Sequence, residues 1–194
     1  MSLRLSGGRL LRSPPGSGTR PTASRVRLAV MNMLAERLPG ARWLDLCSGS
    51  GVMACEALQR GASEVVAVER DRRIAAVARH NLEQVQQGLA PAADGSRPRW
   101  RVEAVEALRW LGRPCDNGFD LVYLDPPYAA GLHGPISEAL AAGGWLQPDG
   151  LLLWECASDS IPKPPAGWSA RPPRRYGGST VLLLEQASAG AGAS

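Results

Sequence analysis

The segment Leu121-Val122-Tyr123-Leu124-Asp125-Pro126-Pro127-Tyr128 carries the strongest structural signal in this chain. Its apolar run stops at Asp125, and the two prolines that follow cannot donate hydrogen bonds to a sheet. The pattern predicts a buried parallel strand whose carboxyl end is followed at once by Asp-Pro-Pro-Tyr. Because open α/β sheets bind their ligands at that edge, we expect a binding site there.

The turn residues suit a planar base that carries an amino group. The carboxylate of Asp125 and the carbonyl of Pro126 can each accept one N–H of an exocyclic NH2, and the ring of Tyr128 can stack on the base. Neither Pro126 nor Pro127 has a backbone N–H that would compete for these acceptors. A rigid surface turn with an exposed tyrosine is the simpler alternative for so short a motif.

The rest of the chain alternates between predicted strands and predicted helices. Helices are expected from about 22 or 24 to 38 and at about 52–60, 72–87, 107–111 and 135–142. Strands are expected at about 43–47, 64–69, 100–104, 121–124 and 151–155. The segments 168–176 and 179–185 flank Gly177-Gly178 and are expected to form a closing antiparallel hairpin. This order predicts an α/β fold with a Rossmann-like, doubly wound, mostly parallel seven-stranded sheet.

Both ends of the chain differ in composition from its centre. Leu3 to Arg12 has the pattern of a small β-hairpin that turns at Gly7-Gly8, and a loop rich in proline, glycine and serine follows. The last residues are small and polar enough to be disordered. We therefore expect a basic hairpin arm at 1–21, one α/β domain at 22–186 and a disordered tail at 187–194.

Arginines are concentrated before the first acidic residue, Glu36. The 194-residue chain has a net charge of +4, and Lys163 is its only lysine, so nearly all of its positive charge can make bidentate contacts with phosphate. An organelle transit peptide and a merely solvated surface are alternatives for the basic arm. We favour an arm that grips nucleic-acid phosphates through five arginines: Arg4, Arg9, Arg12, Arg20 and Arg25.

Composition argues against several other classes of protein. The four cysteines contain no C-x-x-C pair and only two histidines accompany them, so we predict no metal site and no disulfide framework. No apolar run approaches the length of a membrane span, and the N-terminus lacks the apolar core of a secretion signal. We expect a cytoplasmic monomer with no membrane partner, although the arginine-rich start leaves targeting to an organelle open.

A second motif lies in the strand that begins at Trp43. Asp45 is followed by Gly49 and Gly51, and Glu69 ends the next predicted strand. Small residues let the backbone approach a nucleotide, and an acidic residue about twenty positions on can accept both ribose hydroxyls. An NAD-dependent enzyme would show a similar pattern. S-adenosylmethionine is favoured, because a carboxylate at Asp45 would repel a pyrophosphate but attract the ammonium and sulfonium of this donor.

Residues beside these motifs complete the expected cofactor site. Glu106 and the N–H of Ala107 follow the third predicted strand, where they can meet the amino group and ring N1 of adenine. A glutamate that simply begins a helix is an equally good explanation of Glu106. Ser48 and Arg70, next to the glycine turn and to Glu69, are also expected to contact the cofactor.

Together these segments resemble the class I S-adenosylmethionine-dependent methyltransferases, and more narrowly the RsmD-type guanine-N2 methyltransferases of bacterial small-subunit (16S) ribosomal RNA. The narrow resemblance rests on Thr19-Arg20-Pro21-Thr22-Ala23-Ser24-Arg25-Val26-Arg27, on Asp45 to Gly51 followed by Glu56-Ala57-Leu58-Gln59-Arg60-Gly61-Ala62, and on Asp125 to Tyr128. It extends from about Leu3 to Glu185 and makes 22–186 a methyltransferase domain.

The resemblance implies a different role for each group of candidate residues. Asp45, Gly49, Gly51 and Glu69 would hold S-adenosylmethionine, Thr22 would close over it, and Asp125 to Tyr128 would orient the target amine. The implied partner is ribosomal RNA or the small ribosomal subunit. An adenine-N6 methyltransferase acting on DNA or RNA, and a non-catalytic RNA-binding protein, are the alternatives that the motifs leave open.

Overall fold

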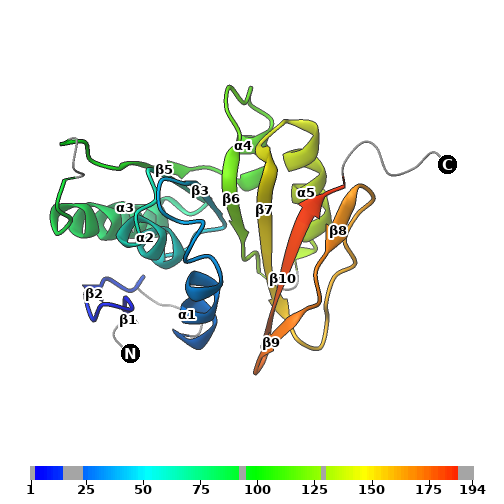
Figure 1. Ribbon diagram of the computed structural model, residues 1–194, viewed down its shortest axis with the longest axis horizontal. Helices are drawn as coiled ribbons and strands as arrows, with labels where there is room; N and C mark the ends of the chain where they lie inside the picture. The colour runs from blue at the N-terminus through cyan, green and yellow to red at the C-terminus, as the bar shows by residue number, and fades with distance from the viewer. Residues whose placement is uncertain (1–2, 15–23, 92–94, 128–129, 188–194) are drawn as a thin grey trace.

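The computed structural model describes residues 3–14, 24–91, 95–127 and 130–187. Figure 1 shows its helices, which are α1 (Ser24–Met33), α2 (Val52–Gln59), α3 (Arg72–Gln87), α4 (Ala107–Leu111) and α5 (His133–Ala142). The strands are β1 (Leu3–Arg4), β2 (Leu10–Leu11), β3 (Arg42–Leu46), β4 (Glu64–Glu69), β5 (Arg99–Ala104), β6 (Phe119–Leu124), β7 (Leu146–Ala157), β8 (Trp168–Ala170), β9 (Arg174–Tyr176) and β10 (Ser179–Gln186).

The central sheet has the order β5-β4-β3-β6-β7-β10-β8, and β9 also pairs with β10. The strands from β5 to β7 are parallel, whereas β10 runs antiparallel to β7, β8 and β9. β8 and β9 share the outer edge of β10, because Pro172 and Pro173 between them cannot donate to the ladder. The predicted Rossmann-like, mostly parallel sheet with seven strand positions and a closing hairpin is confirmed.

Helices cover both faces of this sheet (Figure 1). α1, α2 and α3 pack against one face, where Trp43 and Tyr123 are buried among them. α4 and α5 pack against the other face, which presents Leu44 and Val122. Adjacent residues of one strand enter different cores because successive side chains of a strand point to opposite faces. The connecting loops are therefore left at the two edges of the sheet, where the strands begin and end.

Helix α1 is shorter than predicted. It ends at Met33 rather than near Leu38, and hydrogen-bonded turns follow in which Leu38 N donates to Leu34 O at 3.0 Å. Leu34 and Leu38 are nevertheless buried. The predicted start at residue 22 lies outside the described residues.

Strand β7 is longer than predicted. It begins at Leu146 instead of Leu151, so the expected turn at 148–150 lies inside the strand. The pairing of β6 with β7 shifts register between Phe119 and Leu121, which absorbs the irregular residues without ending the strand.

The N-terminal hairpin forms as predicted, with β1 antiparallel to β2. Leu3, Leu5 and Leu11 are buried in the same core as α1 and α2, and Figure 1 shows the hairpin beside these helices. Most of the connection to α1 lies outside the described residues, and so do residues 188–194, so the boundary at 21 and the disordered tail stay predictions.

No helix in the described part of the chain is long and apolar enough to cross a membrane.

Candidate active site

The turn after β3 is built from left-handed backbone. Cys47, Gly49 and Gly51 have φ angles of 61°, 53° and 73°. A Cβ on Gly51 would lie 3.0 Å from the Cβ of Ala78 in α3, whereas a Cβ on Gly49 would meet nothing within 4 Å. Gly51 is therefore required for close packing of α3 as well as for its φ, and the space beside Gly49 is open.

Glu69 ties this turn to the end of β4. One carboxylate oxygen accepts a hydrogen bond from Gly49 N at 2.9 Å, and the other accepts one from Asp71 N at 2.9 Å. The residue is only 9% exposed. Because both oxygens are fixed by backbone N–H groups, the carboxylate is held in place at the sheet edge, with lone pairs left to accept hydroxyl donors.

Asp45 is buried behind the turn, at 2% exposure, and one of its oxygens accepts a hydrogen bond from Ala54 N of α2 at 3.0 Å. Burial is the main reason that the pKa of Asp45 is raised to about 8; the bond from Ala54 lowers it and the charge of Glu69 raises it. A cation brought near this carboxylate would favour its ionised form. The geometry thus fits the predicted preference for a cationic donor.

The hydroxyl of Ser48 is buried, and it has no hydrogen-bond partner among the residues that the structure describes. Leaving such a group unpaired costs about 1–3 kcal/mol. A polar ligand seated at the glycine turn would remove that cost. Ser48 therefore fits its predicted role as a cofactor contact on an observation independent of the motif.

Glu106 acts as the N-cap of α4, accepting hydrogen bonds from Leu108 N at 3.1 Å and Arg109 N at 2.9 Å. The helix-start explanation of this residue therefore holds. Its side chain is exposed, and Ala107 directly follows it as the first residue of α4. An adenine contact at Glu106 stays a prediction, as does a cofactor contact at Arg70, which is exposed.

Four of the predicted carboxylates converge on Cys47. Burial raises the pKa of its thiol to about 12, and negative charges from four different strand ends add to the rise. In order of effect these charges belong to Glu69, Asp125, Asp45 and Glu106. Residues up to 80 positions apart in the sequence thus lie at the carboxyl ends of four adjacent parallel strands, β3 to β6 in the sheet.

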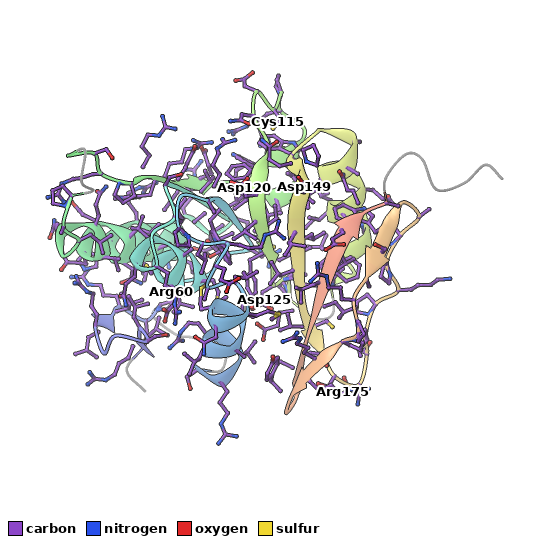
Figure 2. All side chains as sticks on the ribbon, viewed as in Figure 1. Arg60, Cys115, Asp120, Asp125, Asp149 and Arg175 are labelled. Carbon is purple, nitrogen blue, oxygen red and sulfur yellow. The ribbon has the colours of Figure 1, made fainter. Side chains whose placement is uncertain are left out.

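Asp125 lies directly beyond the end of β6, at the edge opposite to Asp120 (Figure 2). Its backbone N–H donates to Leu46 O at 3.5 Å, which keeps it beside β3 and the glycine turn. Asp125 is partly exposed, Pro126 is buried and Pro127 is exposed. Tyr128, like Thr22 and Arg20, lies outside the described residues, so the predicted roles of these three stay predictions.

The sequence interpretation did not include Tyr123 and Glu155, which lie under the Asp125 turn. The hydroxyl of Tyr123 donates a hydrogen bond to the carboxylate of Glu155, and both side chains are buried. Burial, followed by the charge of Glu155, raises the pKa of Tyr123 well above its usual value. A glutamate inside the apolar run Leu151-Leu152-Leu153-Trp154-Glu155 was the signal that could have indicated this pair.

The arm arginines do not all face solvent. The guanidinium of Arg9 donates to Gln84 O, and that of Arg4 to Gly8 O. Arg4, Arg12 and Arg25 are exposed, whereas Arg9 is partly buried. No observation here tests RNA binding by any of them, and that role stays a prediction.

A buried ion pair, also missed from the sequence, holds the arm in place. Arg27 Nε of α1 and Glu56 Oε1 of α2 are 3.0 Å apart. The same oxygen accepts hydrogen bonds from the backbone N–H and the hydroxyl of Ser6, at 2.8 Å each, while Arg27 also donates to Arg4 O. Both motifs that carry the family resemblance thus contribute a residue to this contact, Arg27 from the first and Glu56 from the second.

One open hollow in the described part of the chain lies away from this site. Its volume is about 1030 Å³, and it lies at the opposite edge, where the strands begin; its lining includes Arg42, Glu64, Arg99 and Phe119. It contains none of the motif residues and is an open basic surface.

All four cysteines are free thiols, and no cluster of three or more metal-ligating side chains occurs within the described ranges.

Comparisons with known proteins agree with this geometry. The family model described as conserved hypothetical protein 95 matches residues 5–185. Ribosomal RNA small subunit methyltransferase D of Escherichia coli is 30% identical over 184 residues, which are 94% of this chain and 87% of that protein. The putative rRNA methyltransferase YlbH of Bacillus subtilis is 31% identical over 148 residues, 76% of this chain and 77% of the relative.

Solved structures show the same likeness. A putative methyltransferase from Escherichia coli superposes with a TM-score of 0.79 at 29% identity, covering 96% of this chain and 98% of that one. A putative methylase from Haemophilus influenzae gives a TM-score of 0.75 at 25% identity, covering 96% and 99%.

Proposed function

Because the chain belongs to the family of conserved hypothetical protein 95, and is related over most of its length to ribosomal RNA small subunit methyltransferase D, we propose that it methylates the N2 amine of one guanine in small-subunit ribosomal RNA. The methyl donor in this proposal is S-adenosylmethionine. The observation that carries it is the placement of Asp45, Glu69, Glu106 and Asp125 at the carboxyl ends of four adjacent parallel strands, beside the glycine turn.

The cofactor-binding half of the site uses groups already fixed by the fold. Glu69 is placed to accept hydrogen bonds from ribose hydroxyls, and the Ser48 hydroxyl and the open side of Gly49 leave room for a polar ligand. Asp45 lies behind the turn, and a cationic donor bound there would favour the ionised form of this carboxyl group. Thr22, Arg70, Glu106 and Ala107 complete the proposed contacts.

The substrate half is the Asp125-Pro126-Pro127-Tyr128 turn. A guanine amine is a poor nucleophile because its lone pair is delocalised into the ring. Asp125 and the Pro126 carbonyl accept its two N–H groups, which turns the nitrogen lone pair toward the methyl carbon and stabilises the positive charge that develops on nitrogen. The base must leave its stack to reach the turn, and Tyr128 replaces the lost stacking.

When bound, S-adenosylmethionine supplies an electrophilic methyl group on a sulfonium. Methyl transfer would form the N–C bond as the C–S bond breaks, with the electron pair of the broken bond staying on sulfur, and the proton that the amine loses would pass to solvent water. Placement of the guanine amine against the methyl group supplies most of the rate acceleration, since effective molarities of about 10⁵ to 10⁸ M are attainable for well-oriented groups. Asp125 provides that placement while also neutralising the charge on the amine.

The proposal includes the setting of the reaction. The partner is small-subunit ribosomal RNA, free or in an assembling subunit, and the chain acts as a cytoplasmic monomer. A monomer of 20.6 kDa is the mass expected from sedimentation equilibrium of the purified protein. A concentration-dependent dimer would contradict this part of the proposal.

The test is incubation of the purified protein with labelled S-adenosylmethionine and small subunits that lack their methylations, followed by digestion and mass spectrometry of the nucleosides. N2-methylguanosine is the expected product. N6-methyladenosine, or label on protein alone, would refute the proposed acceptor.

A variant pair makes the same experiment residue-specific. Asp125→Asn keeps the shape of the side chain and removes its charge, so the turnover rate should fall by about 10² to 10³ fold, as for other transition-state hydrogen-bond acceptors and donors. Asp149→Asn, an exposed residue near the opposite edge of the sheet, is the matched control and should leave turnover unchanged (Figure 2).

A further inference from the structure

The register of the sheet places Arg174 of β9 in the same row across the strands as Asp125, and Arg175 in the next row. In β6, Leu124 pairs with Trp154 of β7, so the next row toward the carboxyl edge holds Asp125 and Glu155. Glu155 pairs with Val181 of β10, which pairs with Arg174 of β9. Asp125 and Arg174 therefore stand in one row, three strand spacings apart.

Arg175 lies one row farther toward the carboxyl edge. It pairs with Thr180, which in turn pairs with Cys156 of β7. Figure 2 shows Arg175 and Asp125 toward the same end of the molecule, with Cys115, Asp120 and Asp149 toward the other. With about 4.8 Å between strands, the row from Asp125 to Arg174 spans about 14 Å.

The two arginines point to opposite faces of the edge strand. Arg174 is on the side of Val181, where α1 packs, and Arg175 is on the side of Thr180 and Cys156. Both are exposed. With one guanidinium on each face of β9, the two side chains can contact successive phosphates of a single RNA strand that crosses the edge of the sheet.

Neither arginine is neutralised by a carboxylate in the described part of the chain. Arg171, three residues earlier, forms an ion pair with Glu185. Two acidic residues share the row of Arg174: Glu155 is buried and accepts a hydrogen bond from Tyr123, and Asp125 is three strand spacings away. Both guanidinium groups are exposed and have no ion-pair partner within the described residues, so neither has to break an ion pair before it can bind an anion.

We propose that Arg174 and Arg175 form a second RNA-binding surface, which holds backbone phosphates of the substrate on the side of Asp125 opposite to the N-terminal arm. This inference rests on the proposed function, because it takes the substrate at Asp125 to be RNA. A span of about 14 Å corresponds to about four nucleotide steps of a stacked strand, at about 3.4 Å per step. The arm and β9 then grip the strand on both sides of the target nucleotide.

The position of Pro172 and Pro173 supports this role for β9. Two prolines leave no backbone N–H to pair with another strand at that point of the edge. The outer edge of β8 and β9 is thus protected from strand addition, while the side chains of β9 stay available. Arginine suits phosphate because its planar guanidinium can donate two parallel hydrogen bonds.

The test compares the variants Arg174→Ala, Arg175→Ala and the double variant with Arg171→Ala, which removes the same charge from the same edge where it is already paired. Binding to unmethylated small-subunit RNA is measured across a series of KCl concentrations, and the Michaelis constant for RNA is measured at saturating S-adenosylmethionine. Each phosphate contact contributes about 0.7 to the slope of log K against log salt for a single strand.

We expect the slope to fall by about 0.7 in each single variant and by about 1.4 in the double variant, with a raised Michaelis constant and an unchanged turnover rate at saturation. Arg174→Lys with Arg175→Lys should restore most of the slope, because the charge is retained. Slopes and Michaelis constants equal to those of the wild type would overturn the proposal. So would a loss seen only with assembled subunits and not with free RNA, which would indicate a protein partner.

Failure of the proposed function gives a different result. In that case the wild type makes no N2-methylguanosine, whereas the salt slopes of the variants still report whether this surface binds RNA. Affinity for S-adenosylmethionine, measured by calorimetry, should be the same in all variants and shows that each is folded.

Discussion

Asn81 and Arg12 exchange two hydrogen bonds: Arg12 N donates to Asn81 Oδ1 at 2.8 Å, and Asn81 Nδ2 donates to Arg12 O at 3.1 Å. The same Nδ2 donates to Ser50 O, in the glycine turn, at 3.0 Å. Asn81 is 1% exposed. One buried amide of α3 therefore joins the end of the N-terminal hairpin to the turn that is proposed to hold the methyl donor.

Asn81→Ala should loosen both the arm and the turn. It leaves the N–H and carbonyl of Arg12 and the carbonyl of Ser50 without this partner, so the free energy of unfolding should fall by about 1–3 kcal/mol. Affinity for S-adenosylmethionine, measured by calorimetry, should fall as well, because the glycine turn loses a support. Asn32→Ala, at an exposed position, is the control and should change neither quantity; an Asn81 variant with unaltered stability would contradict the interpretation.

Replacing one partner of the Arg27–Glu56 pair should destabilise the protein far more than replacing both. Glu56 is fully buried, so Glu56→Ala leaves Arg27 as an uncompensated buried charge and should cost about 3–5 kcal/mol. Arg27→Met combined with Glu56→Met removes both charges and should recover part of that stability. Urea unfolding of the single and double variants measures the difference, and a double variant no more stable than Glu56→Ala would contradict the prediction.

Asp45 should make the protein less stable as the pH rises. Its pKa is about 8 in the folded protein and about 3.8 when unperturbed, so between these values the folded state holds a proton that the unfolded state has lost. The free energy of unfolding should then fall with increasing pH, by at most about 1.4 kcal/mol per pH unit, from about pH 4 to about pH 8.

The variant Asp45→Asn isolates this effect. Asparagine keeps an oxygen acceptor for Ala54 N but does not titrate, so the variant should lack this part of the pH dependence. Urea unfolding of both proteins at intervals from pH 4 to pH 9 gives the comparison. Identical pH profiles would show that Asp45 does not hold its proton in the folded state.

Gly51→Ala should be more harmful than a substitution at another glycine with the same backbone. Gly51 and Gly40 have φ angles of 73° and 78°, so alanine is strained at both, by about 1–2 kcal/mol. At Gly51 the new Cβ also lies 3.0 Å from Ala78 Cβ, whereas at Gly40 nothing lies within 4 Å. Thermal melts should show a larger fall in melting temperature for Gly51→Ala than for Gly40→Ala. Equal falls would mean that α3 moves aside for the new Cβ with no loss of stability.

The sequence by itself determined the strand and helix order, the edge of the sheet that carries the candidate site and the identity of the carboxylates there. These follow from local signals, since apolar periodicity sets the strands and Asp-Pro-Pro or a glycine turn ends them. Membership of the methyltransferase family, predicted from the same motifs, is confirmed by the family model over residues 5–185 together with the related methyltransferase of Escherichia coli. The bounds of α1 and β7 were less well predicted, because turns with helix-like bonding and an irregular strand have no distinct local pattern.

Only the tertiary structure decided which distant residues touch. Glu69 holding Gly49, Asn81 joining Arg12 to Ser50, and Glu56 pairing with Arg27 each link positions 20 or more residues apart. The row that places Arg174 beside Val181 depends on the register of antiparallel strands at the C-terminal edge. A one-residue slip would reverse the faces of Arg174 and Arg175, and register is fixed by packing of the whole sheet rather than by the residues of one strand.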